Sequence, residues 1–172
     1  MSKRFAMIAV AACVLSPFDL AAQNPVVSSL RGLYDITKSN ITSTAEILEE
    51  RHYSYRPTED VRTAGQILAH VANAQFMFCS SAAGEQSPSS EDYEQTATTK
   101  AQIGSALQRA FAYCDGVFAN MTDAQVSRSV QFFGGANTAG GVLAFNSAHN
   151  YEHYGNLVTY MRMNGIVPPS SR

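Results

Sequence analysis

The stretch TAGGVLAFNSAHNYEHYGNLVTYMRMNG, residues 138–165, decides the fold. Apolar and amphipathic residues return in it every three or four positions, which is the spacing of one helix face. Thr138 is a good N-cap, and Gly165 followed by two prolines is a normal helix stop. We therefore expect a helix over residues 139–164. Its inward stripe contains Val142, Phe145, Asn146, His149, His153, Asn156 and Tyr160.

The same spacing predicts three further helices, each with one apolar face. They cover residues 25–50, 63–81 and 100–120. A polar linker, residues 82–98, separates the second helix from the third. No convincing strand alternation competes with these patterns. Four long amphipathic helices predict an all-α fold, a four-helix bundle.

Local signals mark the ends of these helices. Asn24 can cap the first helix, and Pro25 suits its first turn. The spacing of a capping box occurs in two places, Thr63 with Gln66 and Thr122 with Gln125. The second pair predicts a short extra helix before the last long one.

The first 22 residues have the layout of a secretory signal peptide. Lys3 and Arg4 give a positive start, and residues 5–15 form an apolar stretch that is too short to span a bilayer. We expect cleavage to leave a mature domain over residues 23–172 in the periplasm or outside the cell. The alternatives are an ordinary buried N-terminal helix and a lipoprotein, because residues 10–13 resemble a lipobox.

Charge and hydropathy exclude some classes of partner. The formal net charge of the 172 residues is -2, which gives no reason to expect binding to nucleic acid or to an anionic membrane surface. Beyond the signal, no stretch is long and apolar enough to cross a membrane. The length suits one domain.

Two cysteines, Cys79 and Cys114, remain when the signal is removed together with Cys13. An even pair in an oxidising compartment is compatible with a disulfide. Two free thiols buried on helix faces are the alternative, since free cysteine is among the most buried residue types.

Three of the four histidines lie on inward stripes. His149 and His153 are four residues apart, which places both imidazoles on one helix face with Cβ atoms ~5–6 Å apart. A third ligand must come from a facing helix, where His70 lies on the inward stripe. Three neutral imidazoles suit Zn, Ni, Cu or Fe better than Mg or Ca, and they leave a coordination position open for water or substrate.

Other polar residues are weaker candidates. Four of them fall near the site by periodicity and are expected to support the histidines or to pack in the core: Tyr34, Asn146, Asn156 and Tyr160. Glu152 lies between the two ligands of the last helix and should point away from them. His52 is expected in a loop. In the alternative interpretation, all three inward histidines are packing residues.

Several blocks resemble DinB-like proteins. They are YRP at residues 55–57, TAGQILAHV at residues 63–71, AHNYEHYGNL at residues 148–157 and YMRMNGIVPP at residues 160–169. The third resembles the H-x-x-x-H of the family's last helix, and the fourth resembles its tail. The similarity covers nearly all of residues 25–170, so the chain is identified as similar to the DinB superfamily.

The resemblance implies an up-down-down-up bundle with a long crossover between the second and third helices. The family's three metal ligands would fall on His70, His149 and His153. Because the second and third helices would then be parallel, Cys79 and Cys114 would lie near the same end of the bundle, which favours a disulfide between them.

Characterised DinB-like proteins are often metal-dependent thiol transferases or isomerases. The resemblance therefore implies a divalent transition metal, with Zn first and Ni or Fe as alternatives, and a transferase of the thiol S-transferase kind or a hydrolase acting on a small molecule. A non-catalytic metal or small-ligand binding protein of the cell envelope is the alternative. Homodimers are common among similar bundles, and the sequence leaves the oligomeric state open.

Overall fold

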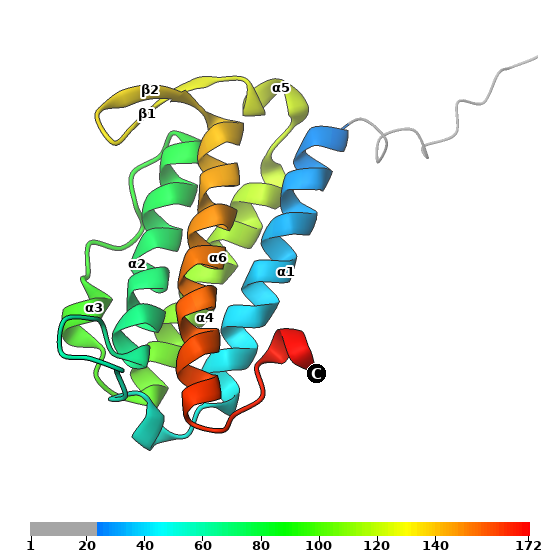
Figure 1. Ribbon diagram of the computed structural model, residues 1–172. Coiled ribbons are helices and arrows are strands. Elements are labelled where there is room, and N and C mark those ends of the chain that lie inside the picture. Colours follow the sequence, from blue (N-terminus) through cyan, green and yellow to red (C-terminus); the bar gives the residue numbers. More distant parts are fainter. Residues whose placement is uncertain (1–23) are drawn as a thin grey trace, which may run out of the picture.

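A computed structural model describes residues 24–172, and it is a bundle of four long helices (Figure 1). The long helices are α1 (Pro25–Ile47), α2 (Ala64–Ala83), α4 (Lys100–Asn120) and α6 (Ala139–Met163). Two short helices, α3 (Tyr93–Thr96) and α5 (Asp123–Val126), join them, and 3₁₀ turns lie at Glu50–His52 and Pro169–Ser171. The expected signal peptide, residues 1–22, lies outside the described residues.

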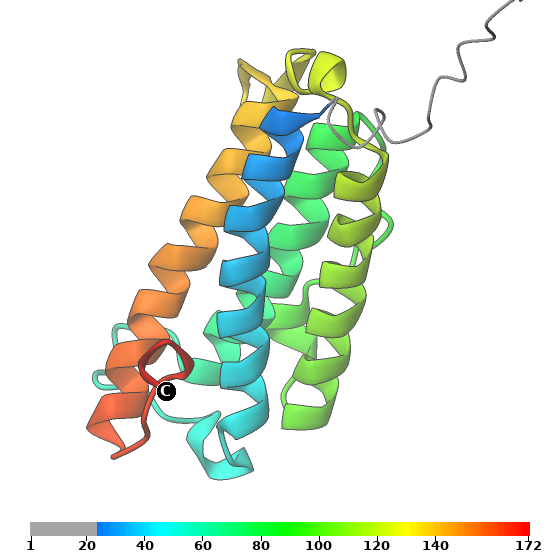
Figure 2. The same cartoon turned by 90° about the vertical axis from the view of Figure 1, so that its right-hand side faces the viewer.

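The direction of the helices confirms the expected up-down-down-up order. In Figure 1, α2 and α4 run parallel to each other and opposite to α1 and α6. The crossover between α2 and α4 returns along the bundle and contains α3, and Figure 2 shows the four long helices from the side. The main packing contacts join α2 to α4 and to α6, and α1 to α6. No helix within residues 24–172 is apolar over enough of its length to cross a membrane.

The predicted boundaries hold to within a few residues, with two corrections. Helix α1 ends at Ile47 and not at residue 50, because the backbone of Leu48 is extended and a separate 3₁₀ turn follows. Helix α2 continues to Ala83, two residues past the predicted end, and stops at Gly84, whose φ is +73°. A left-handed glycine at this position is a common helix C-terminus.

The cap of α1 differs from the prediction. The side chain of Asn24 does not cap the helix and instead accepts a hydrogen bond from the N–H of Asp123 at 2.8 Å. The carboxylate of Asp123 accepts the first free N–H groups of α1, from Val26 at 3.1 Å and Val27 at 2.9 Å. The cap therefore comes from α5, which follows α4 at the same end of the bundle, and no local sequence pattern shows it.

A β-hairpin, β1 (Ser129–Phe132) and β2 (Gly135–Thr138), corrects the expectation that the chain has no strands. Polar and apolar residues alternate in β1, but over only four residues, and β2 is exposed throughout, so the alternation is too short to stand out from the helical patterns. Its turn residues, Phe133 and Gly134, also lack the Asn-Gly or Asp-Gly signal of a tight hairpin.

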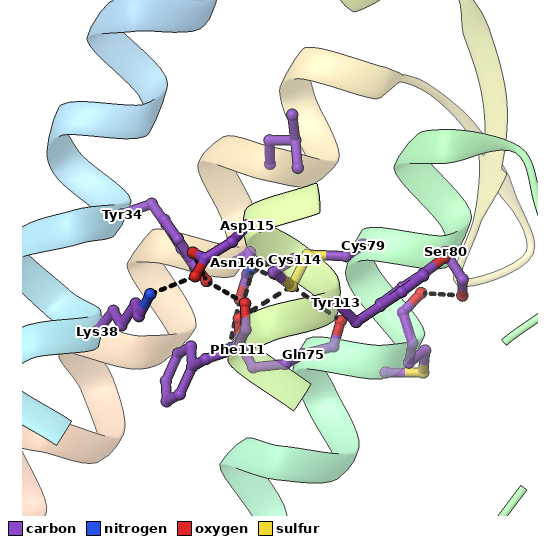
Figure 3. The surroundings of a disulfide bond; sticks show 12 residues. Tyr34, Lys38, Gln75, Cys79, Ser80, Phe111, Tyr113, Cys114, Asp115 and Asn146 are labelled. Carbon is purple, nitrogen blue, oxygen red and sulfur yellow. Dashed lines mark hydrogen bonds and ion pairs between the residues drawn. A yellow bond between two sulfur atoms is a disulfide. The ribbon is translucent and has the colours of Figure 1, made fainter. Parts of the chain in front are cut away.

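The interior combines apolar stripes with a small polar cluster and a disulfide (Figure 3). Cys79 on α2 and Cys114 on α4 are bonded, with their Cα atoms 5.4 Å apart. Beside them, the side chains of Gln75 and Asn146 exchange hydrogen bonds of 2.8 and 2.9 Å. The bond ties the two parallel helices together near one end.

Reduction of this bond should destabilise the bundle. The bond closes a segment with a sequence separation of 35, and releasing it in the unfolded chain should lower the free energy of unfolding by about 2–4 kcal/mol. Urea unfolding with and without reductant measures the change, and a mass gain of two hydrogen atoms verifies reduction. Free thiols in the air-oxidised protein, or equal midpoints after verified reduction, would contradict the prediction.

Candidate metal centre

The three inward histidines converge where α2 packs against α6. The Nε2 atom of His149 lies 3.2 Å from that of His70 and 3.0 Å from that of His153. Ligand nitrogens from all three residues lie within 4.8 Å of one another. The structure thus brings together His70, His149 and His153, which the sequence placed on facing helices.

These separations suit a shared cation. Imidazole nitrogens bind Zn²⁺ at ~2.0–2.1 Å, and two nitrogens at a tetrahedral angle on one ion are then about 3.3 Å apart. The two Nε2–Nε2 distances, 3.2 and 3.0 Å, are close to that value. All three residues therefore present the donor atoms that a transition metal would need.

Glu94 orients His70 from the other side of its ring. The Oε2 atom of Glu94 lies 3.0 Å from Nδ1 of His70, and Nε of Arg62 donates to the Oε1 atom at 2.7 Å. When Nδ1 carries the proton and donates it to this carboxylate, the lone pair of Nε2 points into the cluster. The carboxylate therefore selects the tautomer of His70 that can bind a metal.

The sequence did not reveal Glu94, because it lies in the linker that was expected to be irregular. Helix α3 holds it in place, and Asn73 holds α3 to the turn of α2 that follows His70. The side chain of Asn73 donates to Asp92 at 2.7 Å and accepts the N–H of Tyr93 at 2.9 Å. The only local signal is Asp92, which caps the short helix by accepting the N–H of Glu94.

The other two histidines are neutral at ordinary pH. Burial, followed by the neighbouring imidazoles and Arg62, lowers the pKa of His149 to about 3. Burial, followed by His70, lowers the pKa of His153 to about 4. Within residues 24–172, the buried Nδ1 atoms of His149 and His153 have no hydrogen-bond partner. A metal held at the Nε2 atoms would not satisfy these Nδ1 atoms, so the case for ligands rests on the close Nε2 contacts and the neutral imidazoles.

Two of the four supporting candidates lie in the core away from the cluster. The hydroxyl of Tyr34 donates within the α1–α4 contact, where the acceptors are the carbonyl of Phe111 at 3.2 Å and Asp115 at 3.1 Å. Burial raises the pKa of Tyr34. Asn146 bonds to Gln75, as described above.

The remaining candidates divide. The hydroxyl of Tyr160 donates to the carbonyl of Arg62 at 3.0 Å, so it supports the residue that holds Glu94. Asn156 is exposed, which corrects its expected place on the inward stripe, and Glu152 is exposed as expected. His52 lies in the 3₁₀ turn, where its Nδ1 accepts the N–H of Glu49 at 3.2 Å.

The histidine cluster is accessible from outside. The side chain of His70 keeps 27% of its surface exposed. A separate cavity of about 540 Å³ lies between α1 and α4 beside Lys38 and Asp115, and none of the three histidines lines it. The exposed part of His70 is therefore where a ligand would reach the cluster.

Fold and site together define a four-helix bundle with a three-histidine centre between its second and last long helices. The family model of the DinB superfamily matches residues 33–157. The chain belongs to this superfamily.

Individual relatives agree with this assignment. The uncharacterized protein YjoA of Bacillus subtilis (strain 168) is 25% identical over 135 residues, which cover 76% of this chain and 86% of YjoA. A DinB-like protein from Bacillus cereus has a TM-score of 0.72 at 17% identity, with 83% of this chain and 95% of that chain covered. The mycothiol-dependent maleylpyruvate isomerase has a TM-score of 0.63 at 17% identity, with 76% and 60% covered. These structures share the fold.

Acidification should destabilise the metal-free protein. In the unfolded chain both buried histidines titrate near the ordinary pKa of about 6.5, so below that pH the unfolded state binds more protons than the folded state. The stability is fully present above about pH 6.5 and is lost as the pH falls toward the folded pKa values of about 3 for His149 and about 4 for His153.

Urea unfolding with a chelator, between about pH 7.5 and about pH 4.5, measures this loss. The double variant His149→Gln/His153→Gln is the control, because it lacks both titrating groups and should show a flatter profile. If the free energy of unfolding changes equally with pH in the two proteins, the lowered pKa values of His149 and His153 are disproved.

Proposed function

We propose that this chain is a metal-dependent enzyme of the DinB superfamily in which His70, His149 and His153 hold one divalent transition-metal ion. Zn is the first choice, with Ni or Fe as alternatives. The proposal is carried by the ligand nitrogens of the three histidines, which lie within 4.8 Å of one another, with Nε2 of His149 in contact with Nε2 of both other residues. Three protein ligands leave a position for water or a small molecule, which is the arrangement of catalytic zinc sites.

The reaction that we propose is transfer of a thiol, or hydrolysis, on a small electrophilic molecule. A bound metal supplies acidification of a coordinated water or thiol, which turns it into a nucleophile near neutral pH. The mycothiol-dependent maleylpyruvate isomerase, which shares the fold, is named for a reaction that depends on a thiol. That likeness supports thiol chemistry as the first reaction to test.

The residues of the chain have separate tasks in this scheme. His149 is partly buried and His153 is buried, and both stay neutral, so they can offer lone pairs without first losing a proton. Glu94 holds the ring of His70, and Arg62 donates to that carboxylate and keeps it in position. The exposed part of His70 faces the side from which substrate would enter.

We also propose that the protein is exported. The pattern of residues 1–22 supports export, and so does the Cys79–Cys114 disulfide, since such bonds persist mainly in oxidising compartments. In such a compartment, the thiol used would be one that is available outside the cytoplasm. A non-catalytic metal or ligand carrier of the cell envelope is the second candidate, and the accessible position of the cluster suits it as well.

Metal analysis of purified, untagged protein tests the centre. Mass spectrometry of the wild type should find about one transition-metal ion per chain, and His149→Ala should lose it because two ligands remain. His52→Ala is the matched control, since it removes a histidine outside the cluster and should keep the metal. If neither the wild type nor the control binds Zn, Ni, Cu or Fe after reconstitution, the three histidines are packing residues. Turnover of an electrophile by the loaded protein separates enzyme from carrier.

Glu94→Gln should weaken metal binding by about 10–100-fold, because the neutral amide no longer fixes the tautomer of His70. Competition against a zinc chelator measures the affinity. Glu91→Gln is the control, since Glu91 lies in the same segment but accepts its bond from Thr96. Equal affinities for the Glu94 variant and the wild type would show that the contact does not support the centre. Thermal unfolding of both metal-free variants checks that the bundle is intact.

A further inference from the structure

Four phenylalanine rings gather beside the histidine cluster, and we refer to them as the phenylalanine wall. They are Phe78 on α2, Phe132 on β1, Phe133 in the hairpin turn and Phe145 on α6. Every pair of these rings is in contact, with centroids between 4.2 and 6.1 Å apart. Their exposure rises outward, from 1% for Phe78 to 41% for Phe145 and 69% for Phe133.

The wall is continuous with the candidate metal centre. The ring of Phe78 stands edge-on to the ring of His149 at 5.1 Å between centroids, and Phe145 lies 6.4 Å away from the same ring. One face of the wall therefore borders the histidine whose Nε2 contacts both other ligands. A molecule bound at the centre would meet these rings on that side.

The hairpin holds its part of the wall firmly. The hydroxyl of Ser81, on α2, donates to the carbonyl of Gln131 at 3.0 Å. Just before β1, the guanidinium of Arg128 donates to the carbonyls of Ala82 and Ala83 at 2.7 and 2.8 Å. These bonds fix the hairpin to the C-terminal end of α2, next to Phe78.

Phe133 is at a position that folding alone does not favour. Its φ is 49° and that of Gly134 is 77°, so both central residues of the turn are left-handed. Glycine, asparagine or aspartate is favoured in such a turn, and a bulky aromatic residue with positive φ is rare and strained. The exposed ring also gains little from burial. Strained residues of this kind gather at ligand-binding sites.

The side chains of the hairpin limit the chemical class of ligand that could bind beside it. Residues 129–138 contain no Asp, Glu, Lys or Arg, so the hairpin offers no charged side chain to a partner. Two partly exposed rings and two inner ones suit a planar, uncharged group of similar size. A ligating group on the same molecule could reach the metal at His149.

We propose that the phenylalanine wall binds the aromatic ring of a small molecule whose metal-binding group sits at the three-histidine centre. The inference rests on the proposed metal centre, and it names the class of substrate as an aromatic compound. The wall would act through shape and ring contact, and the histidines through the metal.

Two hydroxamates test the proposal on the zinc-loaded protein. Acetohydroxamate and benzohydroxamate carry the same chelating group and differ in a methyl against a phenyl substituent. Calorimetry should give benzohydroxamate about tenfold tighter binding, as one ring–ring contact with its buried area would provide. In Phe133→Gly this preference should fall at least about threefold, while the melting temperature stays equal or rises because glycine relieves the left-handed turn.

Tyr151→Ala is the matched control. Tyr151 is an exposed aromatic residue of α6, two positions after His149, so its side chain points to another side of the helix. The preference for the phenyl ring should be unchanged in this variant. Equal binding of both hydroxamates by the wild type, or a preference that survives in Phe133→Gly, would overturn the role of the wall and leave the metal centre standing. Failure of the protein to take up zinc would overturn the centre, and this inference with it.

Discussion

The centre depends on one buried hydrogen-bonded contact between α2 and α6. The amide nitrogen of Gln75 donates to Asn146 and to Asn150, at 2.8 Å each, and all three side chains are fully buried. A shift of one helix along the other would leave these amides without partners, at a cost of about 1–3 kcal/mol for each group. The contact therefore sets the register that brings His70 opposite His149. The geometry of the histidine ligands therefore depends on three amide side chains that would not themselves contact a metal.

The two sides of the cluster are built by different means. On one side, a short helix brings a carboxylate to His70, and Asn73 fixes that helix to α2. On the other side, a hairpin fixed by Ser81 brings aromatic rings toward His149. Two of the long helices, α2 and α6, supply the three ligands and two of the aromatic rings, and two connecting segments add the carboxylate and the remaining rings. Such a division lets the surroundings vary while the ligand geometry is kept.

The features that the sequence predicted correctly are those set by local or periodic patterns of residues. Stripes of apolar residues predicted four long helices, and the four-residue spacing of His149 and His153 predicted a shared face. Prediction failed where a contact joins distant segments. Asp123 caps a helix 96 residues earlier in the chain, and Glu94 reaches His70 from a segment with no periodic pattern. The hairpin was not predicted, because Phe133 occupies a turn position where glycine, asparagine or aspartate is usual.

The disulfide has a consequence for motion in the crossover. Cys79 and Cys114 close a covalent ring that contains Glu94 but not His70. If α3 unfolds locally, the strand of chain that carries the carboxylate stays tethered at both ends, a short distance from the imidazole that it left. The effective concentration of the Glu94 carboxylate near His70 remains high. Re-forming their contact then requires only the closure of a loop and no refolding of the bundle. The disulfide contributes by holding α2 and α4 together, so that the two ends of this segment keep their spacing when the bundle loosens.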